Sequence, residues 1–320
     1  QRAQDQAASE EVVRQYKMEA DLEFLDNGKW SETQTRLGPD VESKGLVGHA
    51  ESGSMAGQRF WPEEGRIPKY PNGCQDRCFA SAINASTCTL GVFDGAGGPN
   101  ADRVSTVVAY NVLQYLNTHQ PDQGQSWSKI LSDAFEVVDD VVLKYPNHEE
   151  LWEDSAGCTG VVAVVDLSVK TATVAHVGDS RAIHFVPDED QGAKNMTVAW
   201  QSEDHKSTEK AFGNRKRKTG VNPPTPVPEV NHLYNVKKGS VIVLVSDGIL
   251  NAYQSPEAAV AAMALHLYQL TKDRRGEAEM ALEILRAAEK EANEIYALIP
   301  EEFSRDDMSI CILSVEARSR

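Results

Sequence analysis

The chain has 320 residues, of which 41% are hydrophobic and 25% charged, the composition of a folded globular protein with a sizeable buried core. A formal net charge of −16 argues against a surface that binds nucleic acid or anionic lipid. No run of apolar residues approaches the length of about 18 that indicates a membrane span.

The N-terminal part of the chain carries few strong structural signals. Residues 10–27 are predicted to form an amphipathic helix with Ser9 as its N-cap. Polar sequence containing Gly and Pro then continues to about residue 73, and its clearest apolar run is at 46–50. We therefore expect residues 1–45 to form a helix and an extension on or beside a single domain that spans residues 46–320.

From Cys78 onward the pattern becomes regular. Short apolar runs rich in β-branched residues predict strands, and longer runs with helical spacing predict helices. In chain order these are strands at 78–83 and 88–93, helices at 101–119 and 127–144, strands near 158–166, 171–177 and 181–186, a strand at 241–246, helices at 255–270 and 276–297, and a last strand at 308–315. Strands in blocks with paired helices between them indicate a layered α+β fold.

One long loop interrupts this order, at about 201–230. It carries the basic run Arg215-Lys216-Arg217-Lys218 and then four prolines, and we expect it to form a flap-like insertion. The basic run is interpreted as a solvated segment, with phosphate binding as the alternative.

The five cysteines form no CxxC pair and lack the histidine spacing of a zinc site. A scattered, odd set in a chain of this length indicates reduced thiols. The expected location is therefore intracellular, in the cytoplasm or the nucleus.

Aspartates stand at the ends of several predicted strands. The run 90–93 ends in Asp94-Gly95, and the run 241–246 ends in Asp247-Gly248. Others flank further strands: Asp76, Asp179, Asp306 and Asp307. Such residues are commonly solvated turn residues. If the strand ends converge, however, the carboxylates form an oxygen-rich pocket suited to Mg²⁺ or Mn²⁺.

Other chemistries fit less well. The segment Gly95-Ala96-Gly97-Gly98 matches neither a dinucleotide-binding nor a Walker loop. The segment 178–182 is similar to a nucleophile elbow but leads into a strand instead of a helix, which disfavours a serine hydrolase. The histidines of the region are interpreted as structural side chains and not as metal ligands: His176, His184 and His205.

Six short motifs together resemble the protein phosphatase 2C family of metal-dependent serine/threonine phosphatases. They occur in the family's order across residues 74–316: Gln75-Asp76, Val92-Phe93-Asp94-Gly95-x-Gly97-Gly98, Val177-Gly178-Asp179-Ser180-Arg181, Asp204-His205-Lys206, Val245-Ser246-Asp247-Gly248 and Asp306-Asp307-Met308-Ser309. The resemblance implies a four-layer α-β-β-α sandwich, in which helix pairs flank two central, mainly antiparallel sheets. It also implies two Mg²⁺ or Mn²⁺ ions between those sheets.

The resemblance assigns roles by position. Asp94 would bridge the two ions, the Gly95 carbonyl would bind one of them, and Asp247 and Asp306 would bind the other. Asp76 would position water, and Asp179 would belong to a third metal site. Two ions that share a water acidify it for attack on phosphorus and offset the charge of the phosphoryl oxygens.

Several residues depart from the family pattern. Ala96 stands where many relatives have a histidine that protonates the leaving oxygen, and Pro71 stands where they have a phosphate-binding arginine. Arg66, Lys69 and Arg77 are candidate substitutes for that arginine. Asn251 replaces an aspartate and weakens the third metal site. Asp307 replaces an asparagine, Gln75 replaces a glutamate, and Ser207 replaces a proline.

Two functions remain open at this point. The first is metal-dependent hydrolysis of phosphoserine and phosphothreonine in proteins, with reduced or altered activity. The alternative is a catalytically impaired pseudophosphatase that acts as a protein-binding or regulatory module. The expected partner is accordingly a phosphoprotein substrate or a regulatory protein, and the chain is expected to be a monomer that binds neither nucleic acid nor membrane.

Overall fold

The protein is described from a computed structural model. This structure describes residues 34–37, 40–43, 45–55, 58–61, 65–68, 74–97, 101–121, 125–144, 156–188, 195–205, 210–213, 225–272, 280–296 and 304–317. The predicted helix at 10–27 and the basic run at 215–218 lie outside the described residues. None of the described helices combines the length and the hydropathy needed to cross a membrane.

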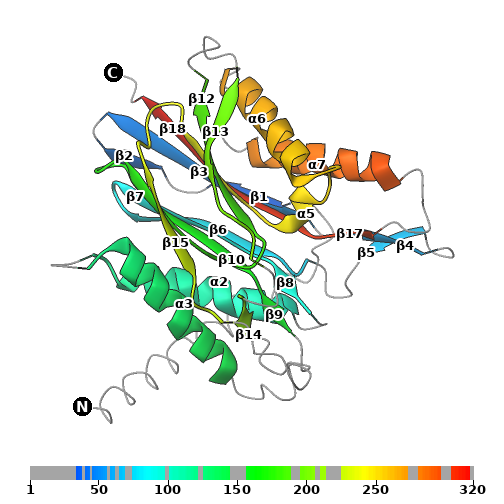
Figure 1. The fold of residues 1–320 in the computed structure, drawn as a ribbon, viewed down its shortest axis with the longest axis horizontal. Helices are drawn as coiled ribbons and strands as arrows, with labels where there is room; N and C mark the ends of the chain where they lie inside the picture. The colour runs from blue at the N-terminus through cyan, green and yellow to red at the C-terminus, as the bar shows by residue number, and fades with distance from the viewer. Residues whose placement is uncertain are drawn as a thin grey trace.

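Two antiparallel sheets form the centre of the molecule (Figure 1). The first has the order β15(Glu229–Tyr234), β11(Thr171–Val177), β10(Gly160–Asp166), β7(Thr87–Phe93) and β6(Arg77–Asn84). The second has the order β1(Gln34–Leu37), β3(Leu46–Met55), β18(Met308–Ala317), β16(Val241–Val245), β12(Arg181–Pro187) and β13(Met196–Gln201), and β2(Val41–Ser43) also pairs with β3.

Two pairs of helices cover the outer faces of these sheets (Figure 1). Helices α2(Ala101–Thr118) and α3(Trp127–Lys144) lie on the five-stranded sheet, and α6(Pro256–Lys272) and α7(Met280–Tyr296) lie on the seven-stranded sheet. The result is the four-layer α-β-β-α sandwich that the family resemblance implies. Two small sheets complete the description: β8(Gly95–Ala96) with β9(Gly157–Cys158) and β14(Phe212–Gly213), and β4(Gln58–Trp61) with β5(Gly65–Pro68) and β17(Ser304–Arg305).

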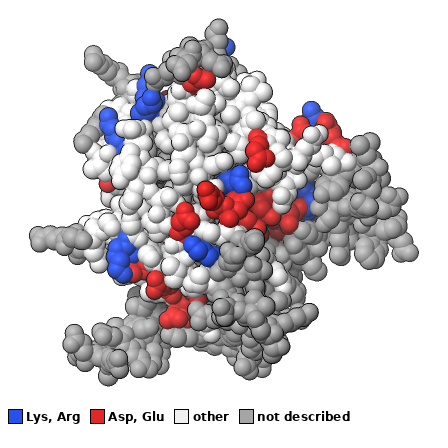
Figure 2. Space-filling model, in the orientation of Figure 1, with Lys and Arg blue, Asp and Glu red and all other residues white. Residues whose placement is uncertain are grey.

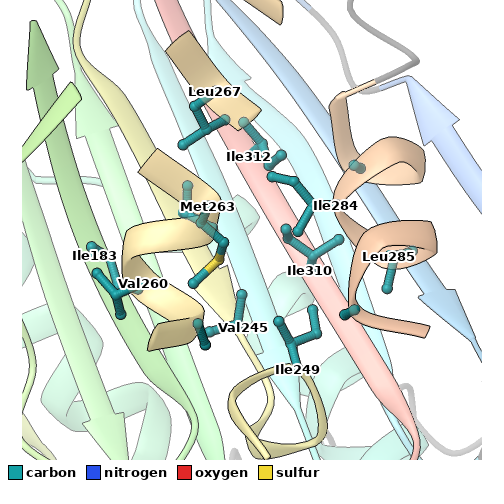
Figure 3. Packing of buried hydrophobic residues seen from close by; sticks show 14 of the residues in the cluster. Ile183, Val245, Ile249, Val260, Met263, Leu267, Ile284, Leu285, Ile310 and Ile312 are labelled. Carbon is teal, nitrogen blue, oxygen red and sulfur yellow. The ribbon is translucent and has the colours of Figure 1, made fainter. Parts of the chain in front are cut away.

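Burial on both faces explains why the central strands are continuous apolar runs. In β10, Val161, Ala163 and Val165 belong to the core between the sheets, whereas Val162 and Val164 belong to the core under α2 and α3. The same alternation holds in the second sheet, where side chains of β12, β16 and β18 pack against α6 and α7 (Figure 3). Strands that are buried on both faces have no polar side to give a period of two.

The polar regions contain more strands than the sequence predicted. The stretch before residue 73, expected to hold little structure, contains the ten-residue strand β3. One of its buried polar residues has a distant partner: Glu51 Oε2 accepts a hydrogen bond from the backbone N–H of Ala281 at 3.0 Å, in the first turn of α7. The described part of the predicted loop at 201–230 likewise contains β14 and the start of β15.

Candidate metal centre

The registers of the strands bring four of the six aspartates to one end of the two sheets. In the first sheet Arg77 pairs with Phe93, so Asp76 lies just before β6 and Asp94 just after β7. In the second sheet Val245 pairs with Ile310, so Asp247 follows β16 where Asp306 precedes β18.

Asp179 joins this group from the connection between β11 and β12. These strands lie in different sheets, so the segment 178–180 crosses from one sheet to the other. Arg181, the first residue of β12, pairs with Val245 of β16, which places the connection beside Asp247. In Figure 2 acidic side chains gather in a band across the middle of the face in view, in the region where Figure 1 places α5(Asp247–Leu250).

Both Asp-Gly glycines are required by close backbone contacts. A Cβ atom at Gly95 would lie 2.6 Å from the carbonyl oxygen of Ala101 and 2.7 Å from that of Gln75. A Cβ atom at Gly248 would lie 1.8 Å from the carbonyl oxygen of Asp307. No L side chain fits at either position without moving the backbone. These two glycines therefore let the segments that carry the aspartates approach one another.

Hydrogen bonds fix the segments around Asp94. Its backbone N–H donates to Thr159 Oγ1 at 3.2 Å, and the N–H of Thr159 donates to the carbonyl of Asp94 at 2.9 Å. Thr159 Oγ1 also lies 2.6 Å from Ser180 Oγ, next to Asp179. Thr159 could not be predicted from the sequence, because its role depends on β10 lying beside β7 and on β9 lying beside β8.

A second set of bonds fixes Asp247. Ser246 Oγ accepts from the N–H of Ser309 at 2.9 Å, which joins the ends of β16 and β18. Asn251 Nδ2 donates to Asp247 Oδ2 at 2.9 Å across the single turn of α5. The sequence predicted a turn at Asp247-Gly248 and missed that this turn is a short helix. Asn251 therefore orients the carboxylate of Asp247.

Burial and mutual repulsion perturb the carboxylates. Burial raises the pKa of Asp76 well above its usual range, and the charge of Asp307 raises it further. Burial also raises the pKa of Asp94, with the charges of Asp76 and Asp247 as the next causes. Burial followed by the charge of Asp247 raises the pKa of Asp179 to about 6. Carboxylates from both sheets are thus near enough to repel one another.

These side chains fit a hard divalent cation. Asp76 is 2% exposed, and neither of its carboxylate oxygens makes a hydrogen bond of normal geometry with the described residues. A buried anion without such a partner is costly, and a cation removes that cost. No three of the described aspartates have carboxylate oxygens all within 4.8 Å of one another. The donors are nevertheless all oxygens, as Mg²⁺ and Mn²⁺ prefer.

Some of the residues that depart from the family pattern, and some of the candidates for phosphate binding, lie in the described part of the chain. Ala96 is exposed at the end of β8 and offers no proton donor or acceptor in its side chain. Arg77 Nη1 donates to the carbonyls of Cys74 and Asp76, both at 2.7 Å, so that nitrogen holds the backbone of the site. Arg181 makes a two-point contact with the carboxylate of Asp204, at 3.0 and 2.6 Å. The other sequence-derived candidates for phosphate binding have side chains outside the described residues: Arg66, Lys69 and the run 215–218.

Comparison with known proteins finds similarity to protein phosphatases of the 2C type. The family model described as Protein phosphatase 2C matches residues 64–211. Protein phosphatase 2C 56 from Arabidopsis thaliana is 24% identical over 329 residues, which cover 91% of this chain and 73% of the relative.

Solved structures of phosphatases share the fold. Serine-threonine phosphatase 2C from Toxoplasma gondii superposes with a TM-score of 0.56 at 17% identity, covering 89% of this chain and 99% of that one. The serine/threonine phosphatase PstP/Ppp of Mycobacterium tuberculosis gives a TM-score of 0.53 at 14% identity, with 84% and 99% covered. A PstP catalytic domain in complex with two manganese ions gives 0.54 at 16% identity, with 85% and 99% covered.

Proposed function

We propose that the chain is a divergent member of the protein phosphatase 2C family, and that it hydrolyses phosphoserine or phosphothreonine in proteins with the help of Mg²⁺ or Mn²⁺. The observation that carries this proposal is the convergence of five aspartates, from both sheets, at one end of the sandwich: Asp76, Asp94, Asp179, Asp247 and Asp306. The PstP structure with two manganese ions supports the choice of metal.

Asp94, the Gly95 carbonyl, Asp247 and Asp306 are the residues that would hold the ions. Bound Mg²⁺ or Mn²⁺ supplies acidification of water and charge neutralisation at the phosphoryl group. Asp76 lies in the first sheet beside Asp94, where a carboxylate accepts a hydrogen bond from a water and orients it. Asn251 holds Asp247 in one orientation through its side-chain amide.

The chain provides no side-chain acid at position 96 for the leaving serine or threonine oxygen. Ala96 is exposed, so the proton for the leaving group comes from solvent or from another donor. A missing general acid slows the reaction by about 10² to 10⁴ for a poor leaving group such as an alkoxide. An aryl phosphate needs little protonation and escapes most of this loss.

The test compares an aryl phosphate with a phosphothreonine peptide in Mn²⁺, in Mg²⁺ and in EDTA. The proposal expects hydrolysis that requires metal, faster for the aryl ester than for the peptide. Asp94→Asn should reduce turnover by at least about 10²-fold. Glu136→Gln, on the outer layer in α3, is the matched control and should leave turnover unchanged. If neither substrate is hydrolysed, or if Asp94→Asn has no effect, the proposal is wrong.

The exposed Ala96 favours a second candidate function, a pseudophosphatase that binds protein partners. This candidate expects folded protein with no metal-dependent hydrolysis of either substrate. The partner in both cases would be a phosphoprotein or a regulatory protein, with the chain acting as a monomer of one domain with an N-terminal extension. The five cysteines are free thiols, which supports the proposed intracellular location.

A further inference from the structure

A second cluster of metal-binding side chains lies outside the aspartate site. His176 of β11, His205 after β13 and Glu229 of β15 each offer one ligand atom, and these atoms all lie within 4.8 Å of one another. Among the described residues this is the one group of three or more that meets this spacing. We propose that His176, His205 and Glu229 form a separate site for a divalent transition-metal ion of the zinc class. This inference does not depend on the proposed phosphatase activity.

The ligand types distinguish this site from the aspartate site. Two imidazoles and one carboxylate are a common set for zinc sites that keep one position open for water. Nitrogen ligands favour zinc, cobalt and nickel ions, whereas an all-oxygen set favours magnesium and manganese. The chain would therefore sort two kinds of divalent ion between two sites.

The spacing of His205 and Glu229 already fits a tetrahedral ion. His205 Nε2 lies 3.2 Å from Glu229 Oε2. Ligand atoms at 2.0–2.1 Å from a tetrahedral zinc ion lie about 3.3 Å from one another. The proton on Nε2 joins these two atoms, and an ion would take its place. Asn231 Nδ2 donates to the other oxygen of Glu229 at 3.0 Å, which holds the carboxylate in this orientation.

His176 is oriented as metal-binding histidines usually are. Its Nε2 donates to the carbonyl of Glu203 at 2.9 Å, so the lone pair lies on Nδ1. That Nδ1 is buried and has no hydrogen-bond partner among the described residues. The ring is 0% exposed and stacks on that of His205, with centroids 4.5 Å apart. An unpaired buried acceptor is unfavourable, and coordination of an ion to Nδ1 would remove that penalty.

The site would link three segments that are distant in the sequence. The backbone N–H of His205 donates to the carbonyl of Gly178 at 2.9 Å, one residue before Asp179. An ion on His176, His205 and Glu229 would therefore fasten the connection that carries Asp179 to β15, at the edge of the first sheet.

The experiment titrates the metal-free full chain with Co²⁺, whose visible absorption reports a four-coordinate site with nitrogen ligands. The titration is done on wild type and on an Asp94→Asn/Asp247→Asn variant, in which the aspartate site is disabled. We expect one equivalent of Co²⁺ to give the same absorption in both proteins, and Zn²⁺ to displace it. Binding should weaken by at least about tenfold in Glu229→Gln and in His205→Asn.

His232→Asn is the matched control, since His232 also lies on β15 but does not belong to the cluster. It should bind Co²⁺ as wild type does. His176→Asn tests the buried ligand, and the more exposed Glu229 provides the test if that variant does not fold. The inference is overturned if wild type shows no such absorption. It is also overturned if the absorption survives Glu229→Gln and His205→Asn, or disappears in the Asp94→Asn/Asp247→Asn variant.

Discussion

The backbone N–H of Gln75 donates a hydrogen bond to Oδ2 of Asp307 at 2.5 Å, although 232 positions separate the two residues in the chain. Asp307 is 2% exposed, and the bond joins the segment before β6 to the segment before β18. One buried hydrogen bond thus connects the two sheets at the end where the aspartates lie.

The first prediction concerns this bond. Asp307→Ala should lower the free energy of unfolding by about 1–3 kcal/mol, because it leaves the buried N–H of Gln75 without its acceptor. Asp307→Asn should cost less, since the amide oxygen accepts the same bond, whereas both variants remove the charge that repels Asp76. Urea unfolding of the two variants at the same pH checks the order. Equal losses for Ala and Asn would contradict it.

The second prediction concerns the glycine beside Asp247. Gly248→Ala should lower the free energy of unfolding by about 3 kcal/mol or more, because its Cβ would lie 1.8 Å from the carbonyl oxygen of Asp307. Gly45→Ala is the control. Gly45 has a φ of +76°, and a Cβ atom there would have no neighbour within 4 Å. Only the strained backbone conformation should therefore lower the free energy of unfolding, by about 1–2 kcal/mol. Chemical unfolding compares the two, and a smaller loss at position 248 would refute the prediction.

The third prediction concerns the neutral residue next to Asp247. Asn251→Asp removes the hydrogen bond to Asp247 Oδ2 and places a second negative charge there. The melting temperature without metal should fall by about 2 °C, and Mn²⁺ should raise it by more than it does in wild type. Asn251→Ala removes the bond without adding charge. Its melting temperature without metal should also fall, but Mn²⁺ should raise it by no more than in wild type. Thermal unfolding with and without Mn²⁺ measures both.

The fourth prediction follows from the proposed function and from the exposed position of Ala96. Ala96→His introduces a side chain that can protonate an alkoxide leaving group. Turnover of a phosphothreonine peptide should rise by about 10²-fold, while turnover of an aryl phosphate changes little. Ala96→Gln, of similar size but without an ionisable group, is the control. An equal effect on both substrates would argue against a role in leaving-group protonation.

The fifth prediction concerns acid stability. Burial lowers the pKa of His184, which is 3% exposed on β12. The unfolded chain then binds a proton near pH 6.5 that the folded chain does not bind until lower pH. Stability from this residue is therefore full above about pH 6.5 and is lost as the pH falls toward the lowered pKa, by at most about 1.4 kcal/mol per pH unit.

His184→Leu removes this titration. The free energy of unfolding, measured by urea at several pH values from 5 to 8, should depend less steeply on pH in the variant than in wild type below pH 6.5. A slope equal to that of wild type would show that His184 does not titrate on unfolding. His232→Leu, at a more exposed site on β15, serves as the control.

The central strands were predictable because burial on both faces gives continuous apolar runs, as in β7 and β16. The helices were predictable because their apolar residues recur with helical spacing. β3 and β15 were not predictable in this way. Glu51 of β3 is buried with a hydrogen bond from the N-terminal turn of α7, and this partner comes from a distant part of the chain. The residues around β3 in the sequence therefore do not indicate that such a partner exists.

The same distinction applies to the two sites. The sequence by itself determined which strands end in carboxylates, and the order of the motifs gave the resemblance to the protein phosphatase 2C family, because strand ends and Asp-Gly turns are local properties. Only the tertiary structure decided that Asp94 and Asp247 lie near enough for their charges to repel, that Asp307 ties the sheets together, and that His176 and His205 stack beside Glu229. These relationships depend on strand register and on the packing of one sheet on the other, which join residues that no sequence spacing relates.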